Sequence, residues 1–193
     1  MRYKISVLYG SVRTNRQGIR AVTFISNQLR SKGFDVQVID PMLLPLPFLD
    51  KMFKEYPDGT APENMQIIGD HLSQSDGFII VTGEYNHSMP PALKNLLDHY
   101  QKEYHYKPSG ILSYSAGRFG GIRAAIQARI TLAELGTPSI PTILSVPQIQ
   151  KTIDAEGSTQ EEWLLKQTTR FINEFEWYVA ALAKQRNEGR PGS

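Results

Sequence analysis

A segment near the start of the chain combines glycine, hydroxyl and cationic side chains in a way that suits an anion. It spans residues 10–18 and reads GSVRTNRQG. Backbone N–H groups at the start of a helix form an anion site, and Arg13 and Arg16 add charge and paired donors that match phosphate. An ordinary helix start capped by Ser11 or Asn15 is the alternative. We favour the phosphate, because helix starts usually carry acids rather than arginines.

The same segment lacks two common nucleotide-binding motifs. A P-loop requires Gly, Lys and Ser or Thr where this chain has Asn15, Arg16 and Gln17. A dinucleotide loop requires three spaced glycines, and only Gly10 lies within the turn. The segment therefore predicts a site for a terminal phosphate rather than a pyrophosphate. Asp40, which a dinucleotide-binding enzyme would use for a ribose, is interpreted as part of a strand-ending turn.

A second segment, residues 83–95, reads GEYNHSMPPALKN and leads into a helix that Pro90 and Pro91 open. Its aromatic, amide, imidazole and hydroxyl groups suit a planar ligand with polar edges. A polar turn with a capping serine explains the same residues equally well, so both interpretations stay open. His87 has no second ligand at a metal-site spacing, and we therefore expect no metal.

A third segment, residues 113–121, reads SYSAGRFGG. Three glycines within five residues suit a close approach of the backbone to a ligand. Ser115 is a poor candidate for a hydrolase nucleophile, because the G-x-S-x-G elbow is absent and no aspartate–histidine pair is placed to activate it. A hydrolase is therefore disfavoured.

The elements that position these segments follow from an alternation of short apolar and amphipathic stretches. Strands are expected at residues 4–9, 34–39, 77–82, 110–114 and 140–146. Helices are expected at residues 16–32, 63–75, 90–103, 119–135 and 159–184. The apolar face of the fourth helix is expected to consist of Ile122, Ile126, Ile130 and Ala133. Such alternation predicts a three-layer, doubly wound α/β fold with parallel strands, in which ligands bind beyond the carboxyl ends of the strands.

The composition narrows the class of protein. The 193 residues, 40% hydrophobic and 21% charged, fit one domain over residues 1–185, with a polar tail at 186–193 that we expect to be disordered. The absence of cysteine excludes disulfides and thiolate chemistry. A net charge of +2 is too balanced for a nucleic-acid partner, and no apolar run approaches the roughly 20 residues of a membrane span. The start of the chain shows no signal peptide, and we expect a cytoplasmic protein.

Together, in this order and after the first, third and fourth strands, the three segments resemble the NADPH-dependent FMN reductase family of flavodoxin-like proteins. That family includes quinone, azo-dye and chromate reductases. The second segment is similar to the family's P-E/Q-Y-N-x-x-x-P-x-x-L-K-N-x-x-D, with Gly83 where proline is usual. The resemblance spans residues 4–146. It implies a flavodoxin-like three-layer sandwich with a five-stranded parallel sheet in the order 2-1-3-4-5.

The resemblance also implies an FMN site that all three segments share. Ser11, Arg13 and Arg16 would hold the phosphate, and Tyr85 would lie against the isoalloxazine ring. Arg118 would serve either the NADPH phosphate or the pyrimidine edge of the flavin. The full set of implied cofactor-binding residues is Ser11, Arg13, Asn15, Arg16, Gly18, Glu84, Tyr85, Asn86, His87, Ser88, Ser115, Gly117, Arg118, Gly120 and Gly121.

The implied function is hydride transfer from NADPH, or NADH, through FMN to quinone, flavin, azo-dye or metal-ion acceptors in a ping-pong order. The cofactor carries the chemistry, so no catalytic side chain is expected. The family usually forms homodimers or dimers of dimers, and the aromatic excess of helix 90–103 predicts that it pairs copies together with helix 119–135. An electron-carrier flavodoxin and a non-catalytic flavin-binding regulatory protein are the alternatives. Carriers usually surround FMN with acids, whereas the first segment here has two arginines.

Overall fold

The computed structural model describes residues 2–191, which fold around one sheet of five parallel strands. The strands are β1 (Lys4–Tyr9), β2 (Asp35–Ile39), β3 (Gly77–Gly83), β4 (Ser109–Tyr114) and β5 (Ser139–Val146). They pair in the order β2-β1-β3-β4-β5. The predicted α/β class, the parallel sheet and its flavodoxin-like order are confirmed.

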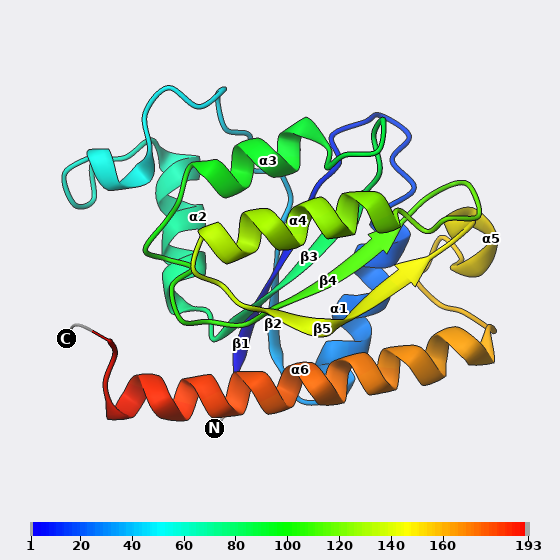
Figure 1. The fold of residues 1–193 in the computed structure, drawn as a ribbon. Helices are drawn as coiled ribbons and strands as arrows, with labels where there is room; N and C mark the ends of the chain where they lie inside the picture. The colour runs from blue at the N-terminus through cyan, green and yellow to red at the C-terminus, as the bar shows by residue number, and fades with distance from the viewer. Residues whose placement is uncertain (1, 192–193) are drawn as a thin grey trace.

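Helices cover both faces of this sheet, so that the molecule has three layers (Figure 1). They are α1 (Ile19–Ser31), α2 (Glu63–Gln74), α3 (Pro91–Asp98), α4 (Ile122–Glu134), α5 (Ile149–Thr152) and α6 (Glu162–Glu188), and a 3-10 turn, η1 (Phe53–Glu55), precedes α2. One apolar core joins α1 and α6 to the sheet, and a second joins α2, α3 and α4 to its other face. The strands β3 and β4 are buried along their whole length, as expected of central parallel strands covered on both sides.

The long helix α6 lies unusually close to the sheet. A Cβ at Gly110 would lie 2.6 Å from the ring of Phe171, and a Cβ at Gly77 would lie 2.9 Å from the ring of Phe175. Both rings are fully buried. The two glycines therefore leave room for the aromatic side chains of α6 against the backbone of the sheet.

The third helix is shorter than expected, since α3 ends at Asp98 rather than at residue 103. His99, Tyr100 and Tyr104 follow it in turns and are 1%, 1% and 0% exposed. Tyr100 packs against Phe53 of η1 and donates a hydrogen bond to a backbone carbonyl of α2. The aromatic excess that the sequence suggested for pairing two copies thus lies inside the protein.

The prediction for the apolar face of the fourth helix is wrong. The buried face of α4 consists of Ala124, Ala125, Ala128 and Leu132. Ile126 and Ile130 are 53% and 69% exposed. Small alanines let α4 approach the sheet closely, and the larger isoleucines consequently point to solvent.

The end of the chain is also more ordered than predicted. Helix α6 continues to Glu188, so residues 186–188 of the expected disordered tail are helical, whereas residues 192 and 193 lie outside the described part of the chain. Arg186 donates hydrogen bonds to Asp76 and to the carbonyl of Tyr106, which fixes this end against the sheet. Within residues 2–191, none of the helices combines the length and apolarity that a membrane span requires.

Candidate functional site

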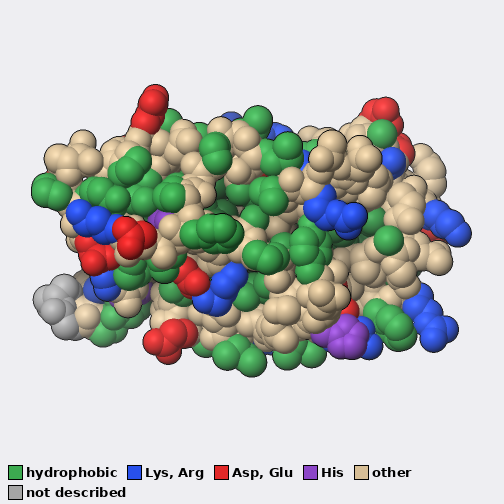
Figure 2. Space-filling view, turned by 90° about the horizontal axis from the view of Figure 1, so that it is seen from above, with side chains coloured by type: hydrophobic (Ala, Val, Ile, Leu, Met, Phe, Trp, Pro, Cys, Tyr) green, Lys and Arg blue, Asp and Glu red, His purple; other side chains and the backbone are tan. Residues whose placement is uncertain are grey.

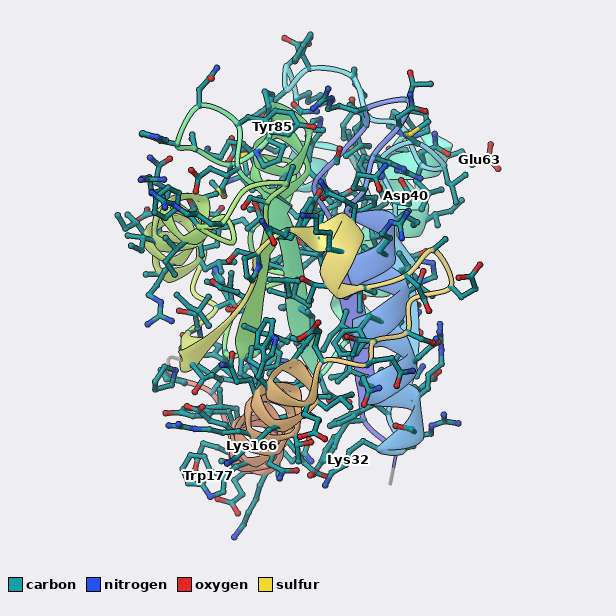
Figure 3. All side chains as sticks on the ribbon, turned by 90° about the vertical axis from the view of Figure 1, so that its right-hand side faces the viewer. Lys32, Asp40, Glu63, Tyr85, Lys166 and Trp177 are labelled. Atoms are coloured by element: carbon teal, nitrogen blue, oxygen red, sulfur yellow. The ribbon has the colours of Figure 1, made fainter. Side chains whose placement is uncertain are left out.

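A cavity of about 310 Å³ lies beyond the carboxyl ends of β1, β3 and β4. This is the position at which doubly wound sheets bind ligands. The residues that line it are Ser11, Arg13, Asn15, Arg16, Gln17, Gly83, Glu84, Tyr85, Tyr114, Ser115, Ala116 and Ile149. In Figure 3, Tyr85 and Asp40 lie together at this end, far from Lys166 and Trp177 of α6.

The structure brings about half of the predicted site residues to the cavity wall. These are Ser11, Arg13, Asn15, Arg16, Glu84, Tyr85 and Ser115. The remaining predicted residues shape or flank the loops without lining the cavity: Gly18, Asn86, His87, Ser88, Gly117, Arg118, Gly120 and Gly121. Sequence reasoning missed Gln17, Gly83, Tyr114, Ala116 and Ile149 as lining residues. Ile149 belongs to the four-residue helix α5, for which the sequence carries no clear periodic signal.

The two arginines of the first loop have different surroundings. The guanidinium of Arg16 donates to both carboxylate oxygens of Asp40 at 2.5 Å and to the carbonyl of Ser11 at 3.0 Å. Asp40 is 4% exposed, and its hydrogen bonds raise the pKa of Arg16 above the ordinary value. Asp40 is therefore more than a turn residue, because it fixes Arg16 and the loop.

Arg13, by contrast, is available to a ligand. Its guanidinium is exposed at the cavity and has no hydrogen-bond or ion-pair partner within residues 2–191. The backbone N–H groups of Thr14, Asn15 and Gln17 likewise make no hydrogen bond to another described residue. One free cation and several free N–H donors in the loop that leads into α1 fit a phosphate group.

The second segment forms a tight turn beside the cavity. The N–H of Tyr85 bonds to the carbonyl of Ser88 at 2.9 Å, and the reverse bond is 3.0 Å long. Asn86 and His87 have φ values of +49° and +65°, as a two-residue type I′ turn requires, and both are exposed at its tip. Ser88 donates to the side chain of Gln127 on α4. The turn thus holds Tyr85 in place, while Asn86 and His87 point away from the cavity wall.

Charge at the site is arranged so that its one acid is neutralised. Glu84 accepts hydrogen bonds at 3.1 Å from the backbone N–H and the guanidinium of Arg123, at the start of α4. A carboxylate is favourable there because of the helix dipole. Arg118 is exposed and lies over the ring of Phe119. Arg13 is consequently the charged lining residue that no described side chain neutralises, and no group of three His, Asp or Glu in the described ranges could hold a metal ion.

Most of the chain matches one family of known proteins. Residues 3–151 match the family of NADPH-dependent FMN reductases. The chain belongs to this family. It is 32% identical over 159 residues to an NAD(P)H-dependent FMN reductase of Schizosaccharomyces pombe, over 78% of each chain. It is 31% identical to a quinone reductase of Pseudomonas putida, over 70% of this chain and 73% of that protein.

A solved structure has the same fold. The flavoenzyme NAD(P)H:(acceptor) oxidoreductase FerB of Paracoccus denitrificans superposes with a TM-score of 0.76 at 22% identity, over 93% of this chain and 98% of FerB. Membership of the family makes this protein an oxidoreductase with FMN as cofactor and NAD(P)H as electron donor. The free donors at the start of α1 fit the phosphate of that cofactor.

Proposed function

We propose that this protein transfers hydride from NADPH or NADH to a small acceptor in a ping-pong order, and that it does so in the cytoplasm. The observation that carries the proposal is the cavity at the carboxyl ends of β1, β3 and β4, with the unpaired Arg13 at its wall. FMN, when bound in this cavity, would supply the redox chemistry of the reaction, because the side chains of the site offer none of their own. The surrounding side chains bind and orient it.

Each loop has a separate task in this proposal. Arg13, Ser11 and the free N–H groups at the start of α1 bind the phosphate. Arg16 does not need to touch the phosphate, because its guanidinium is held by Asp40 and positions the loop. Tyr85, whose hydroxyl lies 3.0 Å from that of Ser11, faces the ring. With Glu84 paired to Arg123 and Arg13 left unpaired, the cavity would lack the acidic surroundings that a carrier usually gives FMN, which supports an enzyme over a carrier.

An apolar groove of about 460 Å³ next to the cavity supports the proposal that the acceptors are flat and uncharged, as quinones are. Its lining residues are Val12, Pro41, Leu44, Pro45, Leu46, Pro47, Phe48, Pro91, Ala92, Asn95 and Leu96. Val12 lies between Ser11 and Arg13 of the cavity wall, so that the two spaces adjoin the same loop. The groove has no charged lining residue, which favours quinones over metal ions.

The proposal includes a homodimer that α4 forms. Ile126 and Ile130 are exposed on α4, and Phe119 before it is 55% exposed. Viewed from the side of α3 and α4, the molecule shows hydrophobic side chains gathered between separate charged groups (Figure 2). Apolar residues at the centre of a surface, with charges around them, are typical of interfaces. Pairing of dimers is a further possibility for the same family.

Steady-state kinetics of the FMN-loaded protein test the proposal. We expect NADPH oxidation to depend on an added benzoquinone, with parallel double-reciprocal lines at different quinone concentrations, as a ping-pong order requires. Intersecting lines would contradict only the ping-pong order, and not the oxidoreductase activity. FMN binding without any turnover would favour the carrier or regulatory protein instead.

A further inference from the structure

Tyr114, the last residue of β4, occupies an unusual position between the ligand-binding loops. Its side chain is almost fully buried, at 7% exposure, yet it lines the cavity. It lies within the apolar core that joins α1 and α6 to the sheet, so its ring is packed while its hydroxyl reaches the polar end. Tyr114 lies in the third segment, but neither the sequence pattern nor the family motif assigned it a role.

Three glycines, one from each ligand segment or its edge, leave the space that Tyr114 fills. A Cβ at Gly18 would lie 2.0 Å from the Tyr114 hydroxyl, and a Cβ at Gly83 would lie 3.1 Å from it. A Cβ at Gly121 would lie 2.6 Å from its carbonyl oxygen. The backbone of Gly18 has φ −65°, which any residue adopts. Position 18 therefore requires glycine because there is no room for a side chain, and not because of its backbone conformation.

The glycine that departs from the family motif also lies against Tyr114. Gly83 stands where proline is usual, and its missing side chain faces the ring of Tyr114. The ring of a proline at position 83 would require the side chain of Tyr114 to shift by a few tenths of an ångström. Gly83 and Tyr114 are therefore matched to each other, as Gly18 and Tyr114 are.

The Tyr114 hydroxyl belongs to a group of hydroxyls at the start of α1. The side chains of Ser11 and Tyr9 lie near enough to affect the pKa of Tyr114, and the Ser11 hydroxyl lies 3.0 Å from that of Tyr85. Burial raises the pKa of Tyr114 well above the ordinary value, and the neighbouring Tyr9 raises it further. Tyr114 thus keeps its proton at neutral pH and can donate a hydrogen bond to an anion instead of repelling it.

We propose that the Tyr114 hydroxyl is a further ligand of the FMN phosphate, to which it donates a hydrogen bond at the first turn of α1. Three observations carry this: the hydroxyl adjoins Gly18 at the N-cap of α1, it neighbours Ser11, and Tyr114 lines the cavity that holds Arg13. The inference rests on the proposed function, because it assumes that FMN binds with its phosphate at α1. In this role the Tyr114 hydroxyl is a neutral hydrogen-bond donor on a buried side chain, beside the exposed guanidinium of Arg13.

Binding measurements with two flavins test this role directly. Tyr114→Phe removes the hydroxyl and keeps the ring. Its apoprotein is titrated with FMN and with riboflavin, which lacks the phosphate, and the quenching of flavin fluorescence gives each dissociation constant. We expect FMN binding to weaken by about tenfold or more, as for a lost hydrogen bond to a charged group, and riboflavin binding to change less than about twofold.

Tyr9→Phe is the matched control. Tyr9 is a fully buried tyrosine next to Tyr114, but it does not line the cavity, and its hydroxyl has no hydrogen bond of ordinary geometry among the described residues. This variant is expected to bind both flavins as the unchanged protein does. A loss of FMN binding in Tyr114→Phe alone supports the proposal.

Two outcomes would overturn it. If Tyr114→Phe weakens FMN and riboflavin equally, the hydroxyl acts through the shape of the cavity; if it weakens neither, the hydroxyl does not touch the phosphate. Failure of the proposed function looks different, because the unchanged protein would then not prefer FMN to riboflavin or would not oxidise NADPH. Thermal unfolding of each apoprotein confirms that the compared variants are folded.

Discussion

The carboxylate of Asp40, at the end of β2, holds both terminal nitrogens of Arg16 at 2.5 Å. The same carboxylate accepts a hydrogen bond from the N–H of Met42, so the loop after β1 and the loop after β2 are joined through one side chain. Two arginines that look equivalent in the sequence therefore differ in function: Arg16 stabilises the loop, and Arg13 is left for the ligand.

Arg13→Ala and Arg16→Ala are consequently expected to fail in different ways. Arg13→Ala should weaken FMN binding by about ten- to a hundredfold, because a hydrogen bond to a charged group contributes about 1.5–3 kcal/mol. Arg16→Ala should lower the free energy of unfolding of the apoprotein by about 3–5 kcal/mol, because it leaves Asp40 buried without its partner. Flavin fluorescence and denaturation in urea measure the two effects.

Riboflavin and a double variant serve as controls. Arg13→Ala should leave riboflavin binding unchanged, since that flavin has no phosphate. Arg16→Ala with Asp40→Ala should be more stable than Arg16→Ala alone, since the unpaired carboxylate is gone. Destabilisation by Arg13→Ala together with a stable Arg16→Ala would contradict this division of tasks.

Arg118 is expected to serve the nicotinamide nucleotide and not the flavin ring. It is exposed over Phe119 and does not line the cavity. Arg118→Ala should therefore raise the Michaelis constant for NADPH several-fold and leave the two-electron potential of the flavin unchanged. Steady-state kinetics and an anaerobic redox titration give both values. A lowered potential with an unchanged Michaelis constant would place Arg118 at the pyrimidine edge instead.

The exposed face of α4 predicts how copies of the chain associate. Ile130→Glu puts a charge at the centre of the proposed interface and should convert a dimer into a monomer at micromolar concentration, as light scattering would show. Leu165→Glu on α6 is the control, because Leu165 is also partly exposed, at 39%, but lies on a different helix. A dimer that survives Ile130→Glu would exclude this face.

Lys107 makes the stability of the protein depend on pH. Its ammonium group is buried and donates to the carbonyls of Leu72 and Ser73 at 2.7 and 2.9 Å. Burial lowers the pKa of Lys107 to about 8, and the charges of Arg186 and Arg190 contribute. A lysine in an unfolded chain titrates near 10.4. Between about pH 8 and 10 the unfolded state therefore binds more protons, and this group makes the free energy of unfolding rise with pH.

Lys107→Met should flatten that rise. Urea denaturation at several values between about pH 8 and 10 gives the slope for each protein. The variant is expected to be less stable at all of them, because the two carbonyls lose their donor, but its stability should change less with pH. Equal slopes in both proteins would show that Lys107 titrates normally.

The parallel sheet could be predicted because fully buried parallel strands and amphipathic helices leave clear patterns. Its strand order was implied only by the resemblance to the reductase family. The phosphate loop was recognisable for a similar reason, since its arginines stand at a helix start. The sequence offered no comparable signal for Asp40, because whether an aspartate at the end of a strand is buried depends on which side chain reaches it from another loop. Tyr114 was part of a recognised segment, but its role depends on glycines that are distant along the chain.

The faces of helices were harder to predict than their positions. In α4, the isoleucine spacing indicated an apolar face, yet alanines cover the core side. Hydrophobicity alone ranks Ile126 above Ala125, whereas the distance between α4 and the sheet admits only small residues there. The exposed isoleucines lie on the face of α4 that we propose pairs two copies of the chain.

The rings of α6 that lie against Gly77 and Gly110 have a consequence for how the protein can be divided. The family match ends at residue 151, but Phe171 and Phe175 belong to a helix that begins at Glu162. A fragment that ends at residue 151 would expose one apolar face of the sheet to water, including the backbone at Gly77 and Gly110, where no side chain covers it. The autonomous folding unit therefore extends beyond the family signature, and any fusion or circular permutation must keep α6 with the strands that it covers.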